Sequence, residues 1–122
     1  MMKRLDYDYC HAAPILEWMS HKWALVTLLR IDAFCTSNQT PSIRFGDLFR
    51  SIPQISEKML ASTLDYLMHE GLVVRHDYHT IAPRVEYALT PIANSFLREI
   101  GYVIEWGQLH FGEIIRGRKI NL

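Results

Sequence analysis

The sequence predicts a mainly α-helical fold with one small β-hairpin, and three consecutive patterns carry this prediction. An amphipathic pattern over residues 56–70 ends at Gly71, a residue type that adopts the left-handed conformation found after many helices. Alternating β-branched and aromatic residues over 73–78 and 85–89 then predict two paired strands. A Thr-Pro pair at 90–91 favours the start of another helix. Helix, hairpin and helix in this order are typical of a winged helix-turn-helix, in which a recognition helix precedes a wing.

The N-terminal part of the chain predicts one short helix and one buried helix. Pro14 is suited to the first turn of a helix over about 12–21. The apolar side chains of this helix are expected to face inward: Ile15, Leu16 and Met19. Nearly every residue over 22–31 is apolar, which is typical of a buried central helix. The stretch 32–43 is polar and predicts a loop that carries Cys35.

The helix-turn-helix is expected over about 44–70. Four apolar residues with helical spacing predict its first helix, which Pro53 ends: Phe45, Leu48, Phe49 and Ile52. Ser56 is a natural N-cap for the second helix, because its hydroxyl can accept a backbone N–H of the first turn. One stripe of that helix is expected to pack inward: Met59, Leu60, Thr63, Leu64, Leu67 and Met68. The opposite face is expected to be exposed and to enter the major groove of DNA: Glu57, Lys58, Ala61, Ser62, Asp65 and Tyr66.

The last helix, expected over about 91–115, has a broad apolar face. Its members are Ile92, Phe96, Ile100, Val103, Ile104, Trp106 and Phe111. Gly101, Gly107 and Gly112 each cost about 1 kcal/mol relative to alanine in a helix, so they predict either the close approach of another helix or kinks. Dimerisation through this helix and packing against the chain's own core are both open interpretations of the pattern.

The composition limits the size, the location and the class of the protein. A chain of 122 residues predicts a single domain over 1–122. Because 49% of the residues are hydrophobic and 21% are charged, we expect a second subunit to cover part of the apolar surface. No run approaches the roughly 20 apolar residues that span a bilayer, and no signal-peptide core is present. Two cysteines are too few for a secreted disulfide scaffold, so we expect a cytoplasmic protein that does not enter the membrane.

The charge balance is unusual for a protein that binds phosphates. Lys and Arg together number 13, and so do Asp and Glu, whereas DNA-binding domains usually carry a basic excess. Between residues 42 and 90 the basic residues are Arg44, Arg50, Lys58, Arg75 and Arg84. The acidic residues of the same stretch are Asp47, Glu57, Asp65, Glu70, Asp77 and Glu86. A DNA-binding surface here therefore requires local sorting of the charges. The alternative is a winged-helix module that binds other proteins and not DNA.

Several short motifs, in their order and spacing, resemble one protein family. They are Cys10 ahead of His21-Lys22-Trp23, Arg44-Phe45-Gly46-Asp47-Leu48, Ile55-Ser56-Glu57-Lys58-Met59-Leu60, Glu70-Gly71-Leu72-Val73, Pro83-Arg84-Val85-Glu86-Tyr87-Ala88-Leu89-Thr90-Pro91 and Glu105-Trp106. Together they resemble the HxlR-type winged helix-turn-helix transcriptional regulators over about residues 10–111. The resemblance implies a homodimer, joined through its terminal helices, that binds a pseudo-palindromic operator. It also places Cys10 where several members have a thiol that senses oxidants or electrophiles.

Seven residues are the candidates for contact with double-stranded DNA: Arg44, Ser56, Lys58, Ser62, Thr63, His79 and Arg84. Lys58 can neutralise a phosphate or reach guanine, and Ser62 can bond to either base type. Thr63 borders the apolar stripe, where packing is the alternative role. On the wing, Arg84 can contact a phosphate or the minor groove, or it can pair with Glu86 two residues further along the same strand face.

A thiol sensor at Cys10 requires a thiolate, hence exposure and positive neighbours such as His11 and Lys22. Burial as a small apolar side chain is the alternative. Cys35 is a candidate to form a disulfide with an oxidised Cys10 of a partner subunit. A thiol-reactive compound is thus one expected effector. A small apolar compound bound near Trp18, Trp23 or Trp106 is the other.

Several kinds of chemistry lack a signature in the sequence. The spacing of Cys10-His11 and of His76 and His79 is not that of a zinc site, so no metal is expected. There is no glycine-rich phosphate loop, nucleophile elbow or convincing acid–base pair, so we expect no enzyme and no cofactor.

Overall fold

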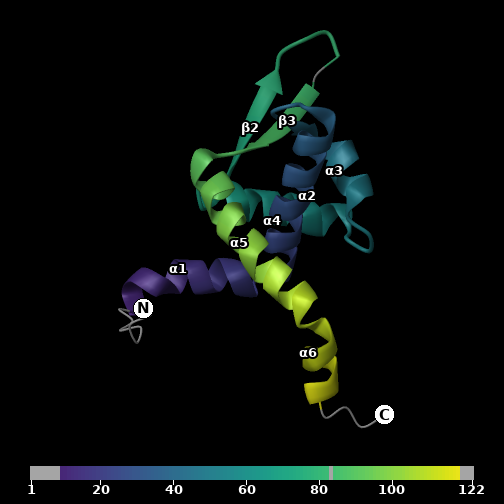
Figure 1. Ribbon diagram of the computed structural model, residues 1–122. Coiled ribbons are helices and arrows are strands. Elements are labelled where there is room, and N and C mark those ends of the chain that lie inside the picture. The colour runs from purple at the N-terminus through teal and green to yellow at the C-terminus, as the bar shows by residue number, and fades with distance from the viewer. Residues whose placement is uncertain (1–8, 83, 119–122) are drawn as a thin grey trace.

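The computed structural model of the chain describes residues 9–82 and 84–118, and its arrangement is shown in Figure 1. In order, the helices are α1 (Tyr9–Ser20), α2 (Lys22–Asn38), α3 (Phe45–Ser51), α4 (Glu57–His69), α5 (Pro91–Leu109) and α6 (Phe111–Gly117). The strands are β1 (Ile43–Arg44), β2 (Val73–Tyr78) and β3 (Arg84–Leu89). The three strands form an antiparallel sheet in the order β1-β3-β2. The predicted fold class, mainly helical with a small β-wing, is confirmed.

Local signals in the sequence set the ends of the helices around the wing. The Ser56 hydroxyl accepts the backbone N–H of Met59 at 3.0 Å and so caps α4. Gly71 follows this helix with a φ of 76°, in the left-handed region that glycine adopts without strain. The Thr90 hydroxyl donates to the carbonyl of Gly71 at 2.8 Å, which ties the end of α4 to the start of α5. Helix α4 is therefore fixed at both ends.

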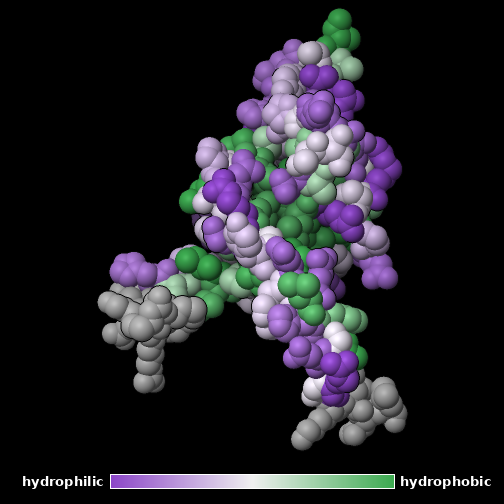
Figure 2. Space-filling model, viewed as in Figure 1, coloured by the Kyte–Doolittle hydropathy of each residue, from purple (hydrophilic) through white to green (hydrophobic). Residues whose placement is uncertain are grey.

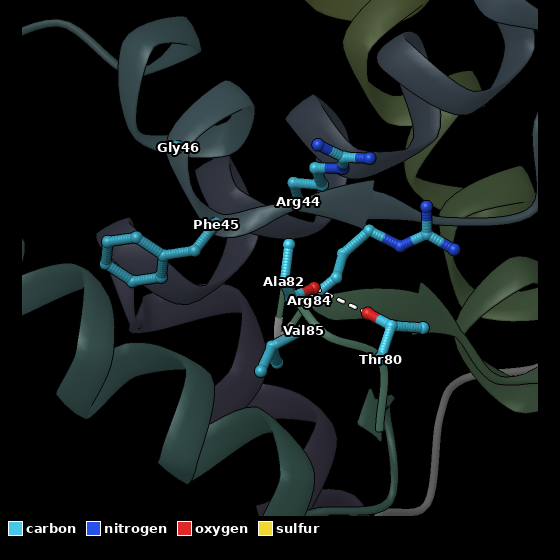
Figure 3. Close-up of a pocket in the computed structure, with 7 residues that line it drawn as sticks. All are labelled: Arg44, Phe45, Gly46, Thr80, Ala82, Arg84 and Val85. Atoms are coloured by element: carbon cyan, nitrogen blue, oxygen red, sulfur yellow. Dashed lines mark hydrogen bonds between the residues drawn. The ribbon is translucent and has the colours of Figure 1, made fainter. Parts of the chain in front are cut away.

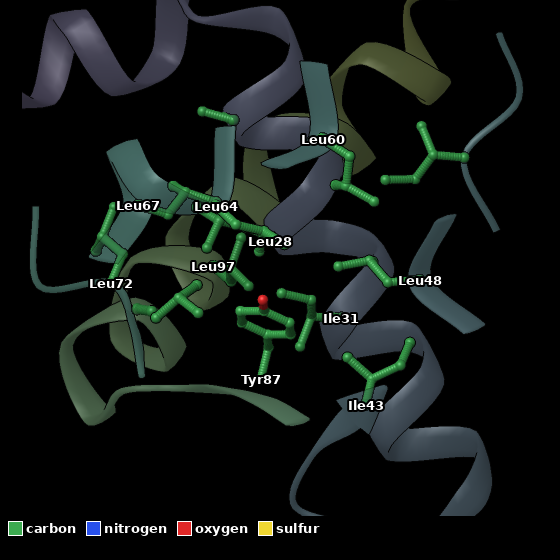
Figure 4. Packing of buried hydrophobic residues seen from close by; sticks show 14 of the residues in the cluster. Leu28, Ile31, Ile43, Leu48, Leu60, Leu64, Leu67, Leu72, Tyr87 and Leu97 are labelled. Atoms are coloured by element: carbon green, nitrogen blue, oxygen red, sulfur yellow. The ribbon is translucent and has the colours of Figure 1, made fainter. Parts of the chain in front are cut away.

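The core lies where α2, α4, the sheet and the first half of α5 meet (Figure 4). Its largest fully buried apolar side chains are Leu28, Ile31, Ile43, Leu48, Leu60, Leu64, Leu67, Leu72 and Val73. The stripe predicted for α4 supplies three of them, so this helix is fixed to the body by its apolar side. Met59 was predicted to belong to that stripe, and this is wrong: it is 41% exposed, at the edge of the outer face.

The predicted loop over 32–43 is wrong for its first seven positions, because α2 continues to Asn38. Ile31 is fully buried, and Phe34 and Cys35 pack against the core one turn later. The side of the helix that faces the core therefore continues into this stretch, although most of its residues are polar. The helix ends where Gln39 takes a left-handed conformation with a φ of 51°. Cys35 consequently lies on a helix and not in a polar loop.

The prediction for the first helix is wrong in two respects. The helix begins at Tyr9, so Pro14 lies inside it and not in its first turn. The three side chains that were expected to face inward are exposed by 42–51%: Ile15, Leu16 and Met19. They face outward because α1 extends away from the body as an arm and meets the rest of the chain near its C-terminal end (Figure 1).

A second arm is formed by the C-terminal part of α5 and by α6 (Figure 1). The helix is interrupted at His110, and a Cβ on Gly101 or Gly107 would meet nothing within 4 Å. The break therefore lies between Gly107 and Gly112, and neither Gly101 nor Gly107 closely approaches another described element of this chain. Large apolar side chains on this arm are exposed: Tyr102, Val103, Ile104, Trp106, Leu109, Phe111 and Ile115. Figure 2 shows some of these apolar surfaces, in green, along the arms as well as in the body.

Across residues 9–82 and 84–118, no helix is long and apolar enough to cross a membrane.

Candidate nucleic-acid interface

The outer face of α4 is polar and free of the core. Glu57, Lys58, Ser62 and Asp65 are exposed there, on the side opposite the buried leucines. The Ser62 hydroxyl donates to the carbonyl of Met59 at 3.2 Å, which leaves its lone pairs available to a donor from outside. Lys58 forms no ion pair within the described residues, so its ammonium group is available to an anion. The major groove admits an α-helix, and hydroxyl and ammonium groups are among those that can contact base edges there.

Thr63 does not belong to this face. It is 1% exposed, and its hydroxyl donates to the carbonyl of Met59 at 2.7 Å. Both its position and its hydrogen bond give it a packing role, the alternative that the sequence left open.

The wing projects from the body beside α4 as a narrow hairpin (Figure 1). All residues of β2 after Val73 are exposed, and His79 lies exposed next to the tip. The Thr80 hydroxyl donates to the carbonyl of Ala82, which shapes the turn between the strands. The hairpin thus presents His79 to the solvent with little support from the core.

Arg44 and Arg84, predicted separately as phosphate contacts, border the same hollow. It has a volume of about 460 Å³ and lies between the start of α3 and the wing (Figure 3). Phe45, Gly46 and Val85 complete its lining together with two residues of the wing tip. Arg44 is exposed and makes no ion pair within the described part of the chain.

Other cations near the wing are already paired. Arg75 lies 3.4 Å from Asp77 on β2, and Arg50 pairs with Asp47 on α3. Arg84 Nε lies 2.8 Å from Glu86 Oε2, the pairing that the sequence left open beside a role in DNA contact. The guanidinium of Arg84 also lies 4.4 Å from the centre of the Tyr78 ring. The sequence predicted the Arg84–Glu86 pair as one alternative, but it gave no sign of the contact between the Arg84 guanidinium and the Tyr78 ring.

A polar junction, also not foreseen, joins α4 to α1. The Tyr66 hydroxyl donates to Glu17 Oε1 at 2.8 Å, and the Trp18 indole N–H donates to Glu70 Oε1 at 2.7 Å. The His21 ring stacks on Tyr66 with centroids 4.8 Å apart. Burial raises the pKa of Tyr66 well above its ordinary value, and the bond to the Glu17 carboxylate adds to the shift.

The two cysteines differ in what the structure shows. Cys10 lies on α1, and its side chain is outside the described part of the structure. Cys35 is half-buried, and burial, reinforced by the charge of Asp32, raises the pKa of its thiol. A raised pKa lowers the thiolate fraction, so the surroundings of Cys35 do not favour rapid thiol chemistry.

The three tryptophans have separate surroundings. Trp18 packs edge-on against Phe96, whereas Trp106 stacks on His110 near the end of α5. The ammonium of Lys22 lies 4.8 Å from the Trp23 ring. Each tryptophan thus has a different ring or cation as its neighbour.

Comparisons with known proteins agree with this arrangement. A family model for the HxlR-like helix-turn-helix matches residues 18–114. A helix-turn-helix-type transcriptional regulator of Methanothermobacter thermautotrophicus is 38% identical over 106 residues, which cover 86% of this chain and 76% of that protein.

Two solved structures extend the comparison to the fold. A transcriptional regulator of the MarR family from Porphyromonas gingivalis W83 has a TM-score of 0.69 at 33% identity, covering 87% of this chain and 97% of its own. The reduced form of the redox regulator HypR has a TM-score of 0.70 at 26% identity, covering 86% and 97%. With its capped recognition helix, its wing and a family match over most of its length, the chain belongs to the HxlR-like helix-turn-helix family of transcriptional regulators.

Proposed function

We propose that the protein is a cytoplasmic, sequence-specific DNA-binding regulator of transcription that acts as a homodimer. One observation carries the proposal: the wing lies at one end of the molecule, α4 crosses the body with its polar face exposed, and the uncovered apolar arms extend from the opposite end (Figures 1 and 2). A protein with this division can bind a duplex with one end and a second copy with the other.

The proposed DNA contacts follow from exposure and charge. Lys58 and Ser62 on α4 face the major groove, with Ser56 near a phosphate at the start of the helix. Arg44, Arg84 and His79 lie on the flank, where the wing meets the DNA backbone.

The proposed dimer covers the two arms. The exposed side chains of α1 and of α5–α6 form apolar surfaces that are costly to leave in water. A two-fold dimer pairs the same patch of each subunit with itself, so each operator half-site should match one recognition helix.

The proposed signal is an oxidant or electrophile that reacts with Cys10. Two facts support it: Cys10 lies on an arm that contacts α4, and the fold is shared with the redox regulator HypR. Modification of the thiol could then shift α1 and, through the contacts of Glu17 and Trp18, the recognition helix.

The test is selection of bound duplexes from a random DNA pool by the reduced protein, first at low and then at moderate salt. We expect a two-fold symmetric motif with half-sites about one helical turn apart. Lys58→Ala should weaken binding and reduce the slope of log affinity against log salt by about 1. If oxidation abolishes binding by the wild type but not by Cys10→Ser, the result would support a thiol switch at Cys10.

A protein-binding module is the second candidate, because Glu57 and Asp65 make the outer face of α4 partly acidic. Failure to enrich any duplex at low salt would favour this candidate and overturn the proposed regulator function. Enrichment would overturn the module.

A further inference from the structure

Glu86 is a carboxylate near the proposed DNA-binding surface, and its surroundings are unlike those of the other acidic residues there. Its side chain is 14% exposed, whereas Glu57 and Asp65 on α4 lie open to solvent. The Ser42 hydroxyl donates to Glu86 Oε1, and Glu86 Oε2 lies 2.8 Å from Arg84 Nε. Each oxygen of the carboxylate thus has its own partner.

Arg84 is held from two sides. Its Nε atom is enclosed beside Glu86, in an ion pair whose angle is not that of a hydrogen bond. The 2.8 Å separation still gives strong attraction, because charge attraction depends chiefly on distance and on the exclusion of water. On the other side the guanidinium lies over the Tyr78 ring, and these two residues are directly opposite each other on β2 and β3.

The contacts to Nε leave the other end of the guanidinium open. Within residues 9–82 and 84–118, no hydrogen bond or ion pair engages the terminal Nη1 and Nη2 nitrogens of Arg84. Figure 3 shows these nitrogens extended away from the strand, with the Arg44 guanidinium reaching toward the same side. Arg44 is the strand partner of Glu86, so both arginines are placed around this one carboxylate.

We propose that Glu86 is a positioning residue that presents Arg84, together with Arg44, to one phosphate of the DNA backbone. The proposal rests on the proposed DNA-binding function and specifies how the wing performs it. A planar guanidinium binds phosphate best through two parallel N–H groups, and a side chain already fixed loses less entropy on binding.

The proposal makes a prediction of opposite sign from simple electrostatics. Removal of a negative charge near DNA should raise affinity, because repulsion with the phosphates falls. If Glu86 positions Arg84, Glu86→Gln should instead lower affinity, because the amide keeps a partner for Ser42 but no longer attracts Nε. We expect a loss of about tenfold, the scale of one charge-assisted contact.

The experiment measures binding of the full chain to its selected duplex by fluorescence anisotropy over a range of salt concentrations. Glu86→Gln, Arg84→Ala and the double variant form a cycle, in which Glu86→Gln should have no further effect once Arg84 is absent. The slope of log affinity against log salt should fall by about 1 in all three, a change that reduced folding alone would not cause. Asp65→Asn is the matched control: it removes one exposed carboxylate that pairs with no arginine in the described part of the chain, and it should bind at least as tightly as the wild type.

A thermal melt would detect misfolding of Glu86→Gln, and in that case a second variant tests the same proposal. Tyr78→Leu removes the ring beneath Arg84 at a site that is 39% exposed, and it should also weaken binding. Equal or tighter binding by folded Glu86→Gln, or by Tyr78→Leu if the former unfolds, would overturn the positioning role and leave the regulator function intact. A wild-type protein that binds no duplex would overturn both.

Discussion

The hydroxyl of Tyr66, on the recognition helix, donates a 2.8 Å hydrogen bond to a carboxylate oxygen of Glu17, on the N-terminal arm. The two residues are 49 positions apart in sequence. Any displacement of α1 must therefore either break this bond or move α4, the helix proposed to face the DNA, along with it.

Tyr66→Phe tests the energetic weight of this junction. The variant keeps a ring to stack on His21 but loses the hydrogen bond, so we expect a loss of about 0.5–1.5 kcal/mol in the free energy of unfolding. Urea denaturation at neutral pH measures it. An unchanged midpoint would show that α1 is attached by other contacts.

Tyr66→Phe should also change how the stability of the protein depends on alkaline pH. Because the pKa of Tyr66 is raised in the folded protein, the neutral hydroxyl is favoured there and the unfolded chain ionises first. The neutral Tyr66 hydroxyl therefore contributes fully to the stability of the fold below the ordinary tyrosine pKa near 10, and this stabilisation is lost as the pH rises above it. Wild-type stability should thus fall more steeply than that of Tyr66→Phe above about pH 10. Parallel profiles would contradict this assignment.

Two buried threonines should respond oppositely to the same substitution. The Thr27 hydroxyl is fully buried and has no hydrogen-bond partner among residues 9–82 and 84–118, whereas the Thr63 hydroxyl donates to the carbonyl of Met59. Thr27→Val should stabilise the protein by about 1 kcal/mol, because it removes an unpaired polar group without changing the volume. Thr63→Val should destabilise it by a similar amount. Thermal melts compare the two, and destabilisation by Thr27→Val would imply that its hydroxyl has a partner in solution.

The two arms, α1 and α5–α6, should form the dimer interface. Leu109 is 77% exposed on α5, so Leu109→Asp costs the folded monomer little but places a charge at the proposed interface. We expect a shift from dimer to monomer in sedimentation velocity at micromolar concentration. Ile81→Asp is the control, since it adds the same charge at a fully exposed apolar residue between β2 and β3. A dimer that survives Leu109→Asp would place the interface elsewhere.

Cys35 should react slowly with thiol reagents in the folded protein. Its pKa is raised by burial and by Asp32, so at neutral pH the thiolate fraction is below that of the unfolded chain. Iodoacetamide labelling followed by mass spectrometry should show several-fold faster modification of Cys35 in urea than in buffer. Comparable rates would indicate that the thiol is more open than its half-buried position implies.

The sequence alone was sufficient where the determinant is local. The Ser56 cap, the left-handed Gly71 and the two strands of the hairpin are each predicted from residues close together in the sequence, and the structure confirms them. The apolar face of the last helix was equally visible, because helical spacing determines which side chains share a side.

Tertiary structure decided the features that depend on what lies across the fold. Polar composition over 32–43 predicted a loop, yet the core accepts Phe34 and Cys35 and so extends α2. Their short spacing suggested that Arg84 and Glu86 could pair. The contacts of Ser42 with Glu86 and of Tyr78 with Arg84, however, form only because β1, β2 and β3 align in one sheet. The contact between Glu17 and Tyr66 left no local trace, because nothing near either residue in sequence specifies the other. Local patterns record what each segment prefers, and the packing of distant segments determines which side chains finally meet.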